Sequence, residues 1–130
     1  MAGTFKFELV TPERMVLSED AAGVIVPGME GEFTVLVGHA PVVSTLRPGV
    51  VDATLSDSRK VRVFVKGGFA EVDSERVIVL AERALDLEAT DAAGIASELQ
   101  TAEAELAAAT TDTARLAANS AVERLRALQR

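Results

Sequence analysis

The chain has 130 residues, 48% of them hydrophobic, and a formal net charge of −7; this length suits one domain, or one domain with an appendage. The acidic balance argues against nucleic acid or an anionic bilayer as the main partner, because phosphate binding needs clustered lysine and arginine. The chain has no cysteine, which excludes disulfides and thiolate chemistry, and no apolar run approaches the roughly 20 residues of a membrane-spanning helix.

Short alternating runs separated by turn residues fill the chain up to residue 86. In the first run, Phe5, Phe7 and Leu9 share one face. Turn residues recur about every ten residues, a spacing typical of a β-sandwich or barrel rather than a parallel sheet with crossover helices. The expected turns lie at 11–13, 18–20, 27–28, 48–49, 56–58 and 73–75.

Two longer blocks stand out among these runs. Residues 31–41 read G-E-F-T-V-L-V-G-H-A-P, which predicts a strand with Phe33, Val35 and Val37 on one face, ended by a glycine. Residues 61–84 repeat the alternation and are interrupted by the Gly67-Gly68 pair. We interpret this pair as a bulge or a tight bend where one strand crosses between sheets.

The hydrophobic period changes near residue 86, after which alanine dominates and helical spacing begins. Two seams joined by a short polar link at 110–113 predict an antiparallel hairpin of two helices. The first seam is Ile95, Leu99, Ala102, Leu106 and Ala109, and the second is Ala114, Ala118, Ala121, Leu125 and Leu128. The predicted fold is therefore mainly β with an α appendage: a sandwich over 1–86 and a hairpin over 87–130.

Charge also separates the two predicted helices. The first, at about 88–109, carries acidic residues and no base, whereas the second carries Arg115, Arg124, Arg126 and Arg130. In one interpretation the charges only keep the hairpin in solution and pair its helices. In the other, the basic helix leaves its partner and docks on an acidic surface elsewhere, because a thin alanine-lined seam makes release easy.

No constellation in the chain supports catalysis. The single histidine, His39, has no nucleophile–base arrangement around it, and neither a zinc cluster nor a phosphate-binding glycine motif occurs. We therefore expect no enzyme activity, no metal and no cofactor. His39 itself has two interpretations: it ties a turn by bonding the neighbouring backbone, or it lies at a contact surface.

The two blocks resemble the ε subunit of F-type proton-translocating ATP synthases from bacteria. That family reads G-E-x-x-I/V-x-x-G-H-A-P and later G-G-F-x-E-V followed by V-x-V-L-A, which residues 31–41 and 67–81 match in order. The resemblance covers about residues 4–86 well and the tail only in pattern.

The resemblance implies a non-catalytic central-stalk subunit that couples proton flow to ATP synthesis. The sandwich would bind the γ subunit along its side and rest one end on the membrane c-ring. The ring-facing loop would be 29–32, so we expect Glu32 first, and Glu30 and His39 after it, at the rotor interface. The hairpin would inhibit ATP hydrolysis when extended, with Arg115, Arg124 and Arg126 against the catalytic α/β head.

Some family members also bind ATP in the folded hairpin through the motif [I/L]-D-x-x-R-A. The matching stretch keeps Leu87 and Ala92, but Glu88 replaces the aspartate and Asp91 replaces the arginine. A negative charge then stands where a phosphate partner is needed, so we expect weak or absent ATP binding.

We expect the protein at the cytoplasmic face of the bacterial inner membrane, attached only through its complex, since no signal or transit peptide is evident. The main alternative is a free-standing β-sandwich binding module with a helical tail. Such a module predicts exposed Trp or Tyr at its loops, and the chain has neither. A small hydrolase is disfavoured by the missing base.

Overall fold

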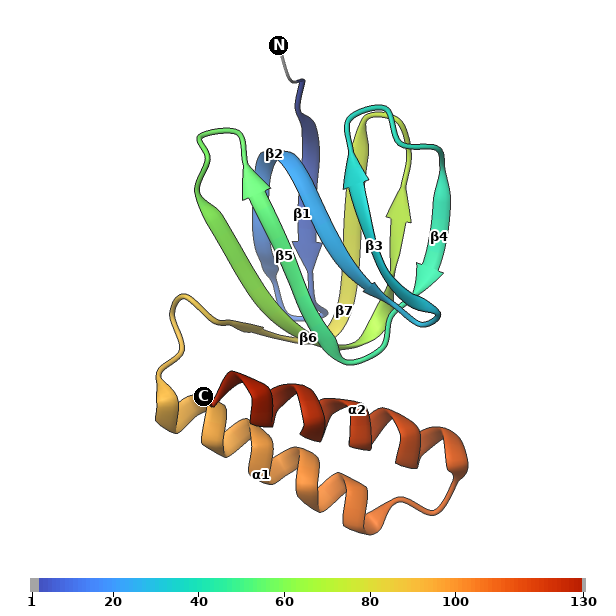
Figure 1. Cartoon of the computed structure of the whole chain (residues 1–130), viewed down its shortest axis with the longest axis vertical. Coiled ribbons are helices and arrows are strands. Elements are labelled where there is room, and N and C mark those ends of the chain that lie inside the picture. The colour runs from blue at the N-terminus through green and yellow to red at the C-terminus, as the bar shows by residue number, and fades with distance from the viewer. Residues whose placement is uncertain (1–2, 130) are drawn as a thin grey trace. The chain divides into compact units, whose positions relative to one another are not determined.

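The computed structural model describes residues 3–129, so Arg130 lies outside the described residues. Seven strands precede two helices, and the chain divides into two compact units between Glu88 and Ala89 (Figure 1). The strands are β1 (Phe5–Val10), β2 (Met15–Gly28), β3 (Gly31–Leu36), β4 (Val42–Thr45), β5 (Gly49–Leu55), β6 (Lys60–Val72) and β7 (Arg76–Asp86), and the helices are α1 (Ala92–Ala108) and α2 (Asp112–Leu128).

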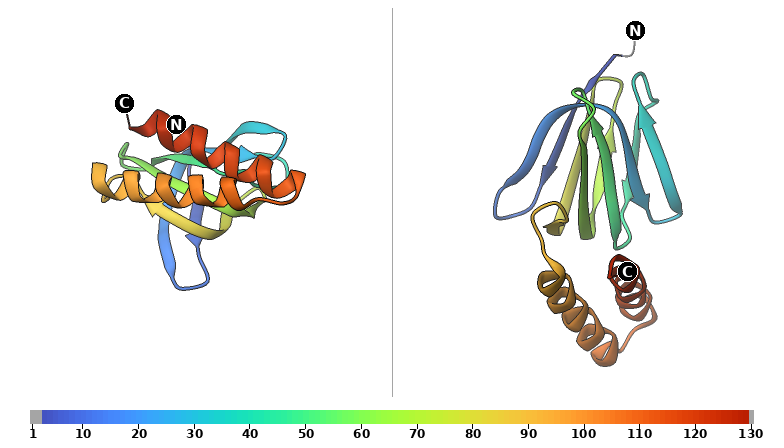
Figure 2. Two further views of the ribbon diagram at one scale, coloured as in Figure 1. Left: turned by 90° about the horizontal axis from the view of Figure 1, so that it is seen from below. Right: turned by 60° about the vertical axis from the view of Figure 1, so that its left-hand side comes forward.

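The β unit is closed by hydrogen bonds on all sides of a flattened barrel. β1 pairs with β7 in parallel and with β2 antiparallel, and the order β1-β7-β6-β5-β2 returns to β1 (Figure 2). β3 adds to the second half of β2, and β4 to the second half of β6. The predicted β domain followed by two packed helices is confirmed. The barrel closes because the long strands β2 and β6 change neighbours along their length, while β3 and β4 each pair with one strand and form edges.

The Gly67-Gly68 pair marks the place where β6 changes its neighbour. Up to Val65 the strand pairs with β5, and from Phe69 onward it pairs with β4. Both glycines have positive φ, +67° and +109°, which other residues rarely adopt. The strand therefore bends at this point without ending.

Three local predictions differ from the structure. Pro27 and Gly28, expected in a turn, are the last residues of β2 and pair with Glu32 and Gly31 of β3, so the turn itself lies at Met29 and Glu30. Residues 18–20 lie inside β2 instead of forming a turn, because their backbone pairs with β1, with Glu19 opposite Phe7. Their polar side chains are exposed or half-buried, so the strand accepts them. Val37 also lies outside the strand on which it was expected: β3 ends at Leu36, and the Val37 side chain is exposed in the following turn.

Valine, leucine, alanine and phenylalanine fill the interior of the β unit. Phe5, Phe7 and Leu9 of β1 are buried, as their alternation predicts. They pack with buried residues of other strands, among them Val24, Val26, Val35, Val51, Leu55, Val63, Val65, Val77 and Val79. This continuous core makes the β unit a stiff body.

The helical unit is an antiparallel hairpin of two 17-residue helices. Asp91 caps α1 by accepting a hydrogen bond from the Gly94 amide at 2.9 Å, and Thr111 caps α2 by accepting one from Ala114 at 3.1 Å. Every residue of the two predicted seams is buried or half-buried except Ala114. Within residues 3–129, no helix combines the length and apolarity needed to cross a membrane.

Candidate interaction surfaces

The β2–β3 turn presents two acidic side chains at one end of the β unit. Met29 and Glu30 form the turn, and Glu32 follows on β3, opposite Pro27; both glutamates are exposed. The turn is held in place because the Met29 amide donates to the Thr45 carbonyl at 2.8 Å and the Arg47 amide donates to the Pro27 carbonyl at 3.1 Å. A fixed acidic turn can set the orientation of a basic or polar partner.

His39 lies at the other end of β3 from Glu32. Six residues form β3, which at about 3.3 Å per residue separates its two ends by roughly 20 Å. The structure therefore brings Glu30 and Glu32 together but does not bring His39 to them. The His39 ring nitrogen Nδ1 lies 2.7 Å from the Ala40 carbonyl oxygen, and the His39 amide donates to the Leu36 carbonyl at 3.1 Å. These bonds fit the interpretation that His39 ties the β3–β4 turn.

An apolar edge on β4 and β6 was not anticipated from the sequence. Val43 is 70% exposed and Phe69 is 40% exposed, on neighbouring strands in which Val43 pairs with Glu71 and Thr45 with Phe69. Val42 and Val43 also belong to an edge strand, since β4 pairs only with β6 in the described sheet. The adjacent valines could have indicated this exposed edge from the sequence, because two successive residues of a strand cannot both face the core. We call Val42, Val43 and Phe69 the apolar edge.

The three candidate arginines of α2 are exposed but have different surroundings. Arg115 pairs with Asp112 of its own helix at 3.1 Å. Arg126 reaches Glu103 on α1, with Nη2 and Oε2 separated by 3.0 Å. Arg124 makes no ion pair with any residue in the described part of the chain. The Arg115–Asp112 pair follows from the spacing of the two residues along one helix. The Arg126–Glu103 pair could not be predicted from the sequence, because it depends on the rotation of one helix against the other.

The region matching the nucleotide motif is occupied by protein contacts. The Leu87 amide donates to the Arg62 carbonyl at 3.0 Å, and the Glu88 carboxylate lies 3.9 Å from Arg62 Nε. The N-terminal end of a helix favours a bound phosphate. At α1 this end is already capped by the Asp91 carboxylate. Ala92, the last residue of the motif, is exposed at the start of α1. A second anion at this position would meet the Asp91 carboxylate.

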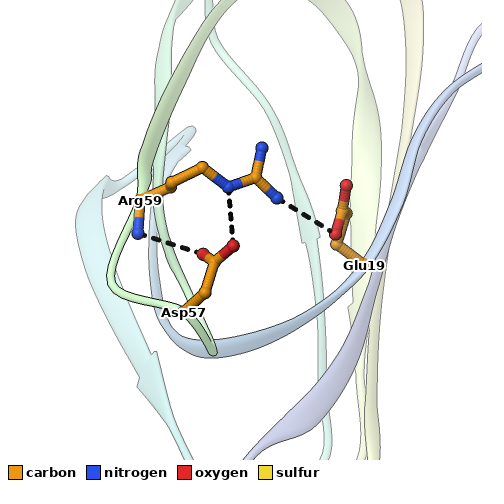
Figure 3. A network of polar contacts seen from close by, with 3 residues as sticks. All are labelled: Glu19, Asp57 and Arg59. Atoms are coloured by element: carbon orange, nitrogen blue, oxygen red, sulfur yellow. Dashed lines mark hydrogen bonds and ion pairs between the residues drawn. The ribbon is translucent and has the colours of Figure 1, made fainter.

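A polar network fixes the β5–β6 turn to β2 (Figure 3). Arg59 Nε donates to Asp57 Oδ2 at 2.7 Å, and Arg59 Nη2 lies 3.5 Å from Glu19 Oε1. The side-chain hydrogen bond from Arg59 is the main cause that holds the pKa of Asp57 below its ordinary value. Asp57 and Arg59 are exposed and Glu19 is half-buried, so the network is a surface clamp. Across residues 3–129, no three His, Cys, Asp or Glu side chains come together as a metal site would require.

Comparison with known proteins shows the family to which the chain is similar. Residues 4–86 match the family described as ATP synthase, Delta/Epsilon chain, beta-sandwich domain. The ATP synthase epsilon chain of Mesorhizobium japonicum is 41% identical over 129 residues, covering 99% of this chain and 96% of the relative. That of Rhodospirillum rubrum is 44% identical over 112 residues, covering 86% and 84%.

Two solved structures share the fold. A chain of the Euglena gracilis mitochondrial ATP synthase, in an assembly of OSCP, F1 and c-ring, superposes with a TM-score of 0.73 at 26% identity, covering 97% of this chain and 79% of that one. A chain from the central stalk and c-ring of the Tetrahymena thermophila mitochondrial ATP synthase gives a TM-score of 0.71 at 14% identity, covering 99% and 98%. The second likeness concerns the fold alone.

Proposed function

The chain belongs to the ATP synthase epsilon chain family, and from this premise we propose that it joins the γ subunit to the c-ring through two surfaces of its β unit. It is a non-catalytic subunit of the central stalk of ATP synthase. Its task is mechanical coupling of proton translocation to ATP synthesis. The closed barrel suits that task, because a well-packed core transmits force with little deformation.

The acidic β2–β3 turn is the proposed ring contact. Glu32 and Glu30 are exposed on a turn that backbone hydrogen bonds hold to the β4–β5 connection. Charges at the rim of an interface mainly set orientation and association rate. We assign Glu32 the larger role, because it follows the turn on a paired strand and its position is therefore better fixed than that of Glu30.

The apolar edge is the proposed contact with γ. An exposed edge strand with two valines and no charge would invite aggregation if it were left uncovered. His39 lies on the turn that leads into β4. Its proposed contact within the rotor is therefore with γ. The two interfaces adjoin at Thr45, which pairs with Phe69 and accepts the hydrogen bond from the Met29 amide, but one surface is acidic and the other is apolar.

The hairpin is the proposed regulatory element. When α2 leaves α1 and extends along γ, Arg115, Arg124 and Arg126 reach acidic groups of the catalytic α/β head and oppose ATP hydrolysis. The subunit remains on the cytoplasmic face of the bacterial inner membrane through these protein contacts alone. Support comes from the exposure of the three arginines and from the alanine-rich helix interface.

A cross-link from position 32 tests the ring contact. The chain lacks cysteine, so Glu32→Cys in the assembled enzyme carries a single attachment point. We expect a photoreactive maleimide at this position to couple to the c-ring. Ser58→Cys, on the β5–β6 turn, is the matched control and should give no ring product. Coupling of Ser58→Cys but not Glu32→Cys to the ring would show that the orientation proposed here is wrong.

A further inference from the structure

One ion pair between the helices involves an arginine that is also a proposed contact with the catalytic head. Arg126 Nη2 of α2 lies 3.0 Å from Glu103 Oε2 of α1, and the two residues are 23 positions apart in the chain. The closed hairpin therefore already uses the guanidinium that the extended hairpin would present to an acidic surface.

Arg126 differs in this respect from the two other candidate arginines. Arg115 is paired with Asp112 three residues earlier in the same helix, so that contact survives when the helices separate. Arg124 has no ion pair with any residue in 3–129, so separation changes nothing in its pairing. Among these three arginines, only Arg126 gains a carboxylate partner when the hairpin closes and loses it when the hairpin opens.

We propose that Glu103 is a latch that holds α2 closed by competing with the catalytic head for Arg126. This inference rests on the proposed docking of α2 on the head. Loss of Glu103 destabilises the closed hairpin and at the same time releases Arg126, so both effects favour the inhibitory state. The hairpin is sensitive to one such pair because alanines make up much of its interface, including buried Ala102, Ala118 and Ala121.

The expected shift in the opening equilibrium of the hairpin is small, because both side chains of the ion pair are exposed. The side chains of Arg126 and Glu103 are 59% and 44% exposed, and exposed pairs of this kind shift an equilibrium by about two- to fivefold. Added salt should reduce the shift, because screening weakens exposed charges.

Hydrogen exchange of the full chain tests the latch directly. We expect Glu103→Gln to speed the exchange of α2 backbone amides by about two- to fivefold at low salt, with amides of the β unit as internal reference. Gln has nearly the helix propensity of Glu, so α1 itself is preserved. Arg124→Gln is the matched control: it removes one charge from the same helix without removing a partner, and should leave exchange unchanged. The swap of Glu103→Arg with Arg126→Glu should restore protection.

Hydrolysis by the assembled enzyme separates the latch from the proposed regulation. With Glu103→Gln we expect slower ATP hydrolysis, because the freed helix docks more often. If exchange quickens but hydrolysis is unchanged, the latch stands and docking on the head is overturned. If α2 exchange with Glu103→Gln equals that of the native chain, the latch is overturned, whatever happens to hydrolysis.

Discussion

The backbone of Gly68 on β6 faces the carbonyl of Leu80 on β7 so closely that a Cβ at position 68 would overlap the oxygen. Its φ of +109° is also one that L-residues rarely adopt. Gly68→Ala should therefore lower the free energy of unfolding by about 3–5 kcal/mol, through backbone strain and a forced shift between paired strands. Urea unfolding monitored by circular dichroism measures this loss.

Gly38 provides the control for backbone strain without overlap. It has a φ of +81°, and no atom lies within 4 Å of the Cβ that an alanine would add. Gly38→Ala should cost only the left-handed backbone penalty of about 1–2 kcal/mol. Equal losses for the two variants would mean that the contact with Leu80 relaxes freely.

The β domain could be predicted because alternation survives wherever one face of a strand is buried, as in Phe5, Phe7 and Leu9. Closure of the barrel could not, because it depends on which strands pair far apart in sequence, such as parallel β1 and β7. The polar residues 18–20 were predicted as a turn because the local sequence does not reveal that they pair with β1.

The sequence could identify individual candidate residues, but it could not predict which of them lie close together. The motif singled out Glu32 and His39, but the six residues of β3 place them at opposite ends of a strand. The apolar edge was missed because Val42, Val43 and Phe69 look like core residues until the edge strand is known. Pairing of Arg126 with Glu103 depends on helix rotation, which the small residues of the seam do not determine.

The Arg59 clamp predicts a pH response of Asp57. Because the hydrogen bond from Arg59 lowers the folded pKa of Asp57, the clamp stabilises the fold above the ordinary carboxyl pKa, and this contribution disappears as the pH falls through the folded value. Arg59→Ala should raise the pKa of Asp57 toward its ordinary value of about 4. An NMR titration of the side-chain carboxyl measures the change.

Lys60→Ala is the control for this titration, because Lys60 lies next to Arg59 but pairs with Asp52 at 3.3 Å. It removes the same charge without removing the hydrogen bond, so the pKa of Asp57 should stay low. If both variants raise the pKa equally, the general field of positive charge is responsible instead of the clamp.

The apolar edge predicts a binding defect without a folding defect. Val43 is largely exposed, so Val43→Asp should leave the melting temperature nearly unchanged, while burying a charge at the interface with γ should weaken binding at least about tenfold. Titration of the variant onto ATP synthase stripped of this subunit measures the affinity. Met15→Asp, at an exposed methionine of β2, should bind normally. A comparable loss for Met15→Asp would disprove the assignment of the apolar edge.

Nucleotide binding is expected to be weak or absent. The Asp91 carboxylate already caps α1, and Glu88 lies beside Arg62, so a phosphate would meet negative charge at the start of the helix. Millimolar ATP should leave the melting temperature of the full chain unchanged in differential scanning calorimetry, with equal ionic strength supplied by salt as the control. A rise of several degrees would contradict this, because only binding to the native state produces it.

Removing the hairpin tests regulation, and the structure indicates where to cut. The Leu87 amide and the Glu88 carboxylate both contact Arg62 of the β unit, so a chain ending at Glu88 keeps contacts that a chain ending at Asp86 loses. The chain ending at Glu88 should still assemble, because its core is complete without the helices. We expect ATP hydrolysis by that enzyme to rise severalfold, since no arginine-bearing helix can reach the head. Hydrolysis equal to that of the full-length enzyme, at equal occupancy of the subunit, would show that the hairpin does not act as a brake.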